Sequence, residues 1–247
     1  MNGTKQILLA GFAALCMVLP ACQSRSTFID NVDAPSPVVS DLPLNSVSYT
    51  AEYTQEGALP FTCEVKLGTN GRIRRDYVWK DEKDAEKKTT VVISGGEAVK
   101  FEDGKTAPVK DVDTAKARFF AGLVLDFDSV VSNASRKKDL QTFDDSDGIP
   151  CCAYVLKLSN IPDMESCLVA ADPKTDRWFL LFVRMNDDSD TVFSTKFQEY
   201  KTESGVTYPS HIVSSTDGGA PVTCTIRDVK INPELPDELF RLSEPNG

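Results

Sequence analysis

The stretch Val47–Gly68, VSYTAEYTQEGALPFTCEVKLG, decides the fold because apolar and polar residues alternate along it. In its first part every second residue from Val47 to Tyr53 is apolar or aromatic, and in its second part the same holds from Phe61 to Leu67. A period of two is typical of half-buried β-strands, since successive side chains of a strand point to opposite faces of a sheet. The stretch therefore predicts two strands that each bury one face.

The alternation continues on both sides of a central interruption. The segment Gly68–Gly71 predicts a turn into a strand over Arg72–Lys80, in which Ile73, Tyr77 and Trp79 share one side. Strands over TTVVIS and EAVKFED complete this meander. The period returns later in the chain and predicts further strands over Cys152–Leu158, Leu168–Ala170, Trp178–Met185, Thr191–Tyr200, Val206–Val213 and Val222–Ile231. We expect about ten antiparallel strands.

The interruption reads as a helix, which Asp113 or Thr114 can cap. Its apolar residues fall on one stripe, widened by Phe120 and Val124, and the stripe consists of Ala115, Phe119, Leu123 and, one turn on, Phe127. An antiparallel sheet of many twisted strands curls, and its concave apolar face needs a cover. The expected fold class is therefore α+β, mainly β: a single strongly curved antiparallel sheet, an unclosed barrel, with the central helical insert over its concave face. The ending INPELPDELFRL is expected to form a short apolar cap.

The N-terminus has the layout of an export signal, in which Lys5 precedes an apolar run from Ile7 to Leu19. The segment LPAC, ending at Cys22, resembles the bacterial lipoprotein signal, in which the cysteine is lipidated and becomes the mature N-terminus. We therefore expect a signal peptide over residues 1–21, the lipid attachment at Cys22 with a flexible, proline-containing tether over 22–45, and one domain over 46–247. The alternative is an ordinary secretory signal with a chance cysteine.

Charge and composition argue against several classes of function. The net charge of −10 becomes −11 when Lys5 leaves with the signal, and a surface this acidic is unsuited to nucleic acid. A His-based metal site cannot be built from His211 alone, and the chain has no CxxC pair. His211 is expected to be a solvated strand residue rather than a catalytic one. We expect no cofactor, no metal and no enzymatic activity.

A resemblance to a known family rests on the order of the pieces. The succession GRIRRDYVW, TTVVISGGEAVKFEDG, a helical insert, LVAADPKTDRWFLLFVR, FQEYKTESGVTYP and IRDVKINPELPDELF resembles the LolA/LolB-like family of bacterial lipoprotein carriers and acceptors and related lipid-binding lipoproteins. The resemblance covers Val47 to Leu242. It implies an unclosed antiparallel barrel with a helical lid, which holds acyl chains in the apolar hollow between them. It also implies a lid-contacting arginine near the start of an early strand, for which Arg74 and Arg75 are the candidates.

Large apolar side chains on the expected strand faces and helix stripe are the candidate lining of such a hollow. They are Tyr49, Tyr53, Tyr77, Trp79, Phe119, Phe120, Leu123, Phe127, Trp178, Phe193 and Phe197. A lipid tail gains free energy for every methylene taken out of water, so its site needs apolar lining rather than catalytic groups. The alternative stays open that the same side chains simply fill a packed core.

Five cysteines remain after Cys16 leaves with the signal and Cys22 takes its lipid. If Cys152–Ser159 and Met164–Ala171 form a hairpin, Cys152 and Cys167 come nearly opposite each other, so this pair is the first candidate for a disulfide. Cys63 and Cys224 are expected to be small buried hydrophobic residues.

These observations leave three hypotheses. The first is an envelope lipoprotein, lipid-anchored at the outer membrane and facing the periplasm, that binds lipid or acylated lipoprotein and has a role in lipoprotein sorting. The second is an envelope sensor or structural lipoprotein of the same fold whose hollow is filled and whose partner is another envelope protein. The third is an enzyme, which the thin inventory of catalytic groups disfavours.

Overall fold

The computed structural model describes residues 28–138, 141–143, 149–159, 161, 164–185, 192–216 and 219–243, and the expected signal peptide and Cys22 lie outside them. The strands are β1 (Phe28–Asp30), β2 (Val39–Ser40), β3 (Ser46–Gln55), β4 (Phe61–Gly68), β5 (Arg72–Lys80), β6 (Glu86–Ser94), β7 (Glu97–Glu102), β8 (Lys105–Pro108), β9 (Val131–Lys137), β10 (Gln141–Phe143), β11 (Ile149–Leu158), β12 (Met164–Ala171), β13 (Trp178–Met185), β14 (Val192–Glu203), β15 (Val206–Thr216) and β16 (Val222–Ile231). The helices are α1 (Asp111–Leu125), α2 (Phe127–Val130) and the 3₁₀ helix η1 (Asp237–Phe240).

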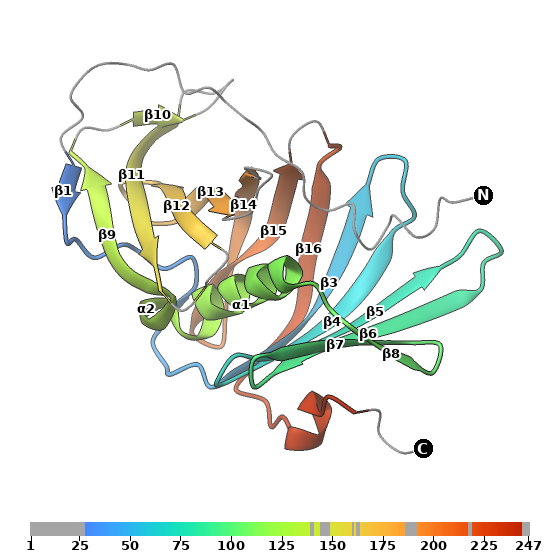
Figure 1. Ribbon diagram of the computed structural model, residues 1–247. Helices are drawn as coiled ribbons and strands as arrows, with labels where there is room; N and C mark the ends of the chain where they lie inside the picture. The colour runs from blue at the N-terminus through green and yellow to red at the C-terminus, as the bar shows by residue number, and fades with distance from the viewer. Residues whose placement is uncertain are drawn as a thin grey trace.

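All of the strands belong to one antiparallel sheet that does not close on itself. Its order is β1-β9-β11-β12-β13-β14-β15-β16-β3-β4-β5-β6-β7-β8, with β10 beside β11 and β2 beside β15. Two meanders, β3 to β8 and β11 to β16, are therefore joined by the pairing of β16 with β3, and α1 lies in front of the curved sheet between them (Figure 1). The expected fold class is confirmed. The sheet has 16 strands in the described part of the chain, more than the ten expected, because several strands are too short to show a period.

Strand register decides which residues face α1. Tyr49 pairs with Val65, and Val65 pairs in turn with Arg75, so the three side chains share one face across β3, β4 and β5. This face contacts Ala117 and Ala121 of α1, which identifies it as the concave face. The prediction that Ile73, Tyr77 and Trp79 share one side of their strand is confirmed by the same register.

Helix α1 begins earlier than expected. Lys110 is its N-cap and makes no side-chain capping bond, so the expectation that Asp113 or Thr114 caps the helix is wrong. The Thr114 hydroxyl instead donates to the Lys110 carbonyl at 3.1 Å inside the first turn, where Asp111 and Asp113 suit the positive end of the helix dipole. The helix ends at Leu125, and Phe127 belongs to the separate turn α2 rather than to the same stripe.

Part of the segment expected to be a tether packs on the sheet. Strand β1 pairs with β9, and Val39 and Ser40 of β2 pair with β15. Between them the indole Nε1 of Trp178 donates to the Pro35 carbonyl at 2.7 Å. A buried indole requires such an acceptor, and this requirement holds the chain between β1 and β2 against the domain.

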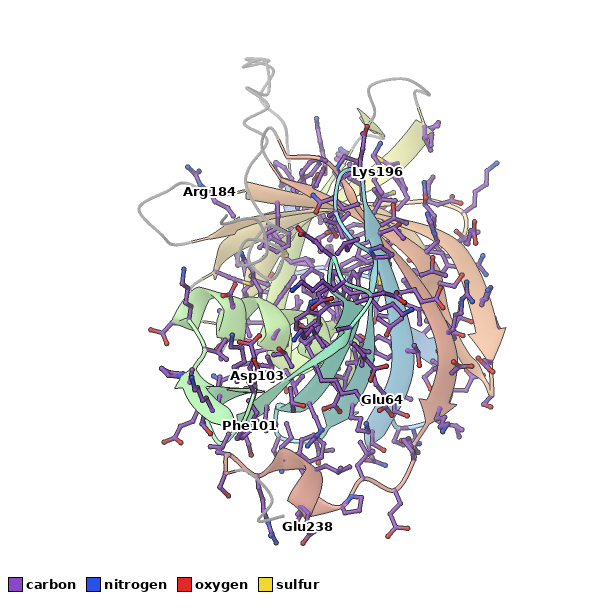
Figure 2. The ribbon with its side chains drawn as sticks, turned by 90° about the vertical axis from the view of Figure 1, so that its right-hand side faces the viewer. Glu64, Phe101, Asp103, Arg184, Lys196 and Glu238 are labelled. Carbon is purple, nitrogen blue, oxygen red and sulfur yellow. The ribbon has the colours of Figure 1, made fainter. Side chains whose placement is uncertain are left out.

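The C-terminus forms the short apolar cap that was expected. Phe240 of η1 is buried against Gly68, and the Arg72 guanidinium lies 4.9 Å from the centre of its ring. Arg72 also forms an ion pair with Asp237. The cap therefore closes the end of the sheet at the β4–β5 turn, and Glu238 marks its position at the lower end of the molecule in Figure 2.

Candidate functional site

The concave face divides into two halves that differ in how completely they are buried. We call the strands β9 and β11–β14 the packed half and the strands β3–β6 the accessible half. Residues Phe119 and Leu123 of α1 pack on the packed half, and Ala117 and Ala121 pack on the accessible half. The helix therefore lies between two apolar clusters and contributes one of its sides to each.

In the packed half the candidate lining residues form a solid core. Phe119, Trp178 and Phe193 have no exposed surface, and Leu123 and Phe197 are also buried. Trp178 packs edge-on against Phe197 with ring centres 6.0 Å apart. A close-packed interior of this kind holds few voids larger than a water molecule. For these five residues the structure supports the alternative that the side chains fill a packed core.

Two further candidates lie at the border of this core. Phe120 and Phe127 are half-buried, and each contacts a ring of the packed half. The centre of the Phe120 ring lies 5.8 Å from that of Phe193, and the Phe127 ring meets Trp178 edge-on at 6.1 Å. They extend the packed half rather than the accessible one.

In the accessible half the candidate residues keep part of their surface exposed. Tyr49, Tyr53, Tyr77 and Trp79 are all half-buried on the concave face. Tyr53 stacks on Phe61 with ring centres 4.6 Å apart. We define the aromatic floor as the rings of Tyr49, Tyr53, Phe61, Tyr77 and Trp79, together with the buried Cys63, Val65 and Cys224 between them.

The two arginine candidates separate onto opposite faces. The Arg74 side chain lies on the outer face, where Nε and Nη2 donate to the two carboxylate oxygens of Asp76 at 2.8 Å each and Nη1 donates to the Leu239 carbonyl of η1 at 3.2 Å. Lys66 and Thr90 complete this outer network around Asp76. Arg75, in contrast, lies on the concave face among the aromatic floor residues. Of the two, only Arg75 shares a face with α1.

Burial keeps the aromatic floor neutral. It raises the pKa of Cys63 to about 12 and that of Cys224 to about 11, and it raises the pKa of Tyr49 and Tyr53 well above the usual 10. The charge of Arg75 opposes these shifts without cancelling them. At pH 7 the hydroxyl and thiol groups are therefore all protonated.

Arg75 stays charged in this neutral setting. Burial disfavours its charge, but an arginine keeps its proton at neutral pH in proteins. Its pKa lies above the ordinary value because Tyr77, Tyr53 and Tyr49 carry negative charge at the pH where Arg75 would titrate. Burial raises the pKa of Tyr77 too, against the charge and the hydrogen bond of Arg75. The Nε of Arg75 has no accessible surface and no hydrogen-bond partner. The aromatic floor thus holds a cation with an unused donor.

The predicted disulfide is wrong. Strands β11 and β12 do form the expected hairpin, but its register places Cys152 opposite Ala171 and Cys167 opposite Leu156. The two sulfurs are therefore four residues out of register, and both cysteines are free and buried. Cys63 and Cys224 are buried in the apolar cluster of the accessible half, as predicted.

A surface hollow of about 530 Å³ lies away from the aromatic floor, beside the β12–β13 turn. Ile149, Pro150 and Phe179 provide apolar lining, and the rest comes from the turn 172–177 and from 197–200 of β14. Trp178 and Phe197 of the candidate set border it from the core side. Most of its accessible wall is apolar, and its mouth is open to solvent.

The described residues support neither a metal site nor a membrane-spanning helix. No group of three or more metal-ligating side chains comes together among them. None of the helices built from these residues has the length and the hydropathy that crossing a bilayer requires.

Comparison with known proteins identifies the fold. No family model and no curated protein matches the chain. A LolA superfamily protein from Nitrosomonas europaea is 13% identical with a TM-score of 0.55, and a DUF1329 family protein from Desulfovibrio piger is 11% identical with a TM-score of 0.56. A domain described as an outer membrane lipoprotein-sorting protein from Vibrio parahaemolyticus is 9% identical with a TM-score of 0.54. Each match covers 81% of this chain and 91% of the other. The fold is LolA/LolB-like, as the resemblance in sequence implies.

Proposed function

We propose that the protein is a membrane-tethered lipoprotein of the cell envelope that binds the acyl chains of lipids or lipoproteins between α1 and the aromatic floor. The observation that carries the proposal is the half-buried state of Tyr49, Tyr53, Tyr77 and Trp79 on the concave face. Large rings that face the interior of a fold and still keep accessible surface leave apolar area for a ligand to cover.

Acyl chains suit this surface for a physical reason. Each methylene that leaves water contributes about 0.8 kcal/mol, and rings of tyrosine and tryptophan provide large apolar area for it to contact. Because Cys63 and Cys224 keep their protons at neutral pH, the floor between the rings presents no thiolate to an alkyl chain.

Helix α1 is the element that covers the ligand. Ala117 and Ala121 bring the helix close to the sheet in the accessible half, where larger side chains would hold it away. In the packed half Phe119 and Leu123 anchor the same helix. We expect the helix to pivot on this anchored side when a ligand enters, and Arg75, which shares its face, to be the lid-contacting arginine.

The tether and the location belong to the same proposal. Cys22 is the lipid attachment site, and the protein lies at the outer membrane and faces the periplasm. Its partners are then a lipid or an acylated lipoprotein, with a role in lipoprotein sorting. Fold relatives that include a lipoprotein-sorting domain support this placement.

Ligand uptake tests the proposal. The chain from Gln23 onward keeps every described residue, and it is purified without detergent and titrated with a fluorescent 16-carbon fatty acid. We expect saturable binding that Trp79→Ala weakens about tenfold, while Val78→Ala, on the opposite face of the same strand, leaves binding unchanged. Mass spectrometry of the organic extract identifies any lipid that copurifies. Absence of saturable uptake and of extractable lipid would refute the proposal.

The packed half favours a second candidate, an envelope sensor or structural lipoprotein that binds a protein. Its support is the complete burial of Phe119, Trp178 and Phe193, because filled space takes no ligand. Capture of a defined envelope protein by the purified chain, together with no uptake of the fatty acid, would favour it.

A further inference from the structure

The position of Arg75 is unusual for a charged side chain. It lies at the centre of the accessible half, opposite Val65 on β4 and Val91 on β6. Its Nε is buried and has no hydrogen-bond partner. Arg75 is half-buried and forms a hydrogen bond with Tyr77, but a buried donor without a partner, such as its Nε, costs free energy.

Its sequence neighbour shows what a satisfied guanidinium looks like in the same strand. Arg74 is held by both oxygens of Asp76 and by the Leu239 carbonyl on the outer face. Among the described residues no comparable carboxylate contact holds Arg75. The charge of Asp113 in α1 raises the pKa of Tyr77, but by less than the charge of Arg75 lowers it. The outer arginine is therefore satisfied within the protein, while the inner one keeps an unused donor.

The groups around Arg75 are suited to binding an anion beside it rather than to serving as its counter-ions. Tyr49, Tyr53 and Tyr77 place three neutral hydroxyl groups near the guanidinium, and a neutral hydroxyl can donate to an anion. Val65 and Val91 on either side offer no polar alternative. A guanidinium fork matches the two oxygens of a carboxylate or of a phosphate.

We propose that Arg75 binds the anionic headgroup, a carboxylate or a phosphate, of an acyl ligand that enters the accessible half head first. The inference rests on the proposed function and narrows it to amphiphiles with a charged end. In this arrangement the hydrocarbon chain runs from Arg75 along the aromatic floor beneath α1. Neutral acyl esters would bind on the same surface but would leave the guanidinium unpaired.

Competition against a neutral dye tests the inference. The protein from Gln23 onward is loaded with N-phenyl-1-naphthylamine, which is displaced by palmitate, by hexadecyl phosphate and by methyl palmitate. These probes share a 16-carbon chain and differ in the headgroup. In the unaltered protein we expect the better of the two anions to displace the dye at a concentration about tenfold lower than methyl palmitate does, because a charge-assisted hydrogen bond forms. The tighter of the two anions identifies the headgroup as carboxylate or phosphate.

Variants locate the effect. Arg75→Met should abolish the preference for the anions, so that palmitate, hexadecyl phosphate and methyl palmitate displace the dye at similar concentrations, and Arg75→Lys should retain part of the preference. Arg74→Met is the matched control and should keep the full preference, because Arg74 lies on the outer face. Without ligand, Arg75→Met should unfold at the same or a slightly higher temperature, because it removes a half-buried charge whose Nε donor is unsatisfied.

The outcomes separate the two proposals. Equal displacement by palmitate, hexadecyl phosphate and methyl palmitate in the unaltered protein would overturn the role of Arg75 and leave acyl binding intact. A preference that persists in Arg75→Met would also overturn it. Failure of the dye and of all three amphiphiles to bind would refute the proposed function itself. The measurement on the unaltered protein decides the matter even if the methionine variant fails to fold.

Discussion

The packed half and the accessible half are built from the same kind of antiparallel strand, yet they bury their concave faces differently. In the packed half, polar atoms of the large rings find partners inside the protein: Trp178 donates to the Pro35 carbonyl, and the Tyr200 hydroxyl donates to the Trp178 carbonyl at 2.8 Å. In the accessible half three of the rings are tyrosines near a guanidinium with an unused donor. The difference shows that one curved sheet can bury its large rings completely in one half and leave large rings partly accessible in the other.

The largest expected effect contrasts the two tryptophans. Trp178→Ala removes a fully buried ring and should lower the free energy of unfolding by about 3–5 kcal/mol. Trp79→Ala removes a half-buried ring from the accessible half and should cost less than about 1.5 kcal/mol. Urea unfolding followed by far-UV circular dichroism measures both. Equal losses would mean that the accessible half is as tightly packed as its counterpart.

A second prediction concerns the anchored end of α1. A Cβ added at Gly122 would lie 2.0 Å from Cγ2 of Val130, so Gly122→Ala should destabilise by about 1–3 kcal/mol. This outweighs the gain of about 1 kcal/mol that alanine brings to a helix interior. Adding Val130→Ala should restore part of the loss, as thermal unfolding of the double variant would show. A more stable Gly122→Ala protein would indicate that α1 is loosely held there.

A smaller effect is expected on the outer face of the accessible half. Burial opposes the charge of Asp76, but hydrogen bonds from Arg74 and Thr90 and the charge of Lys66 hold its pKa below the usual value. A lowered pKa stabilises the folded state above pH 4 and loses this contribution as the pH falls through the folded-state value. Asp76→Asn should therefore cost about 1–2 kcal/mol at pH 7 and progressively less below pH 4, as urea titrations at several pH values would show.

Asp84→Asn is the control for that titration. Its ion pair with Lys80 is solvent-exposed, and such pairs contribute little to stability. A loss in Asp84→Asn as large as that in Asp76→Asn would mean that general surface charge, rather than the Asp76 network, sets the acid stability.

The smallest effect is expected from reduction. Because no disulfide joins the cysteines of the described residues, dithiothreitol should leave the unfolding temperature unchanged. Burial raises the pKa of Cys63 and Cys167 to about 12, so alkylation of the folded protein by iodoacetamide at pH 8 should be slow and should follow unfolding. A reductant-sensitive unfolding temperature would contradict the free state of these thiols.

Sequence periodicity predicted the parts of the fold that depend on local pattern. Strands β3 to β6 alternate clearly because one face is buried and the other solvated, and the stripe of α1 is visible for the same reason. Strands β1, β2 and β8 are too short to establish a period. Strand β9 carries small and polar residues on both faces, so it shows no alternation. The start of α1 was missed because its cap uses backbone groups alone.

The sequence predicted the candidate residues of the site but not where in the fold they come together. The alternation gave the correct face for Tyr49, Tyr77 and Trp79. Whether a ring is fully buried or keeps accessible surface depends on how α1 packs between the two meanders. That packing arises from long-range strand pairing rather than from local sequence pattern. The same limit explains Cys152 and Cys167, since a hairpin's register follows from its turn and not from the apolar pattern alone. Arg75 was separable from Arg74 only by register.

Strand β1 has a consequence for where the domain sits. Phe28 is paired with β9, and a chain as long as the one from Cys22 to Phe28 spans at most about 20 Å. With Cys22 lipidated as proposed, the edge of the sheet at β1 is held close to the phospholipid headgroups, where Phe28 and Ile29 already present exposed apolar side chains. The protein would then stand on the bilayer by one fixed corner, with an orientation set by that corner, instead of diffusing at the end of a long leash.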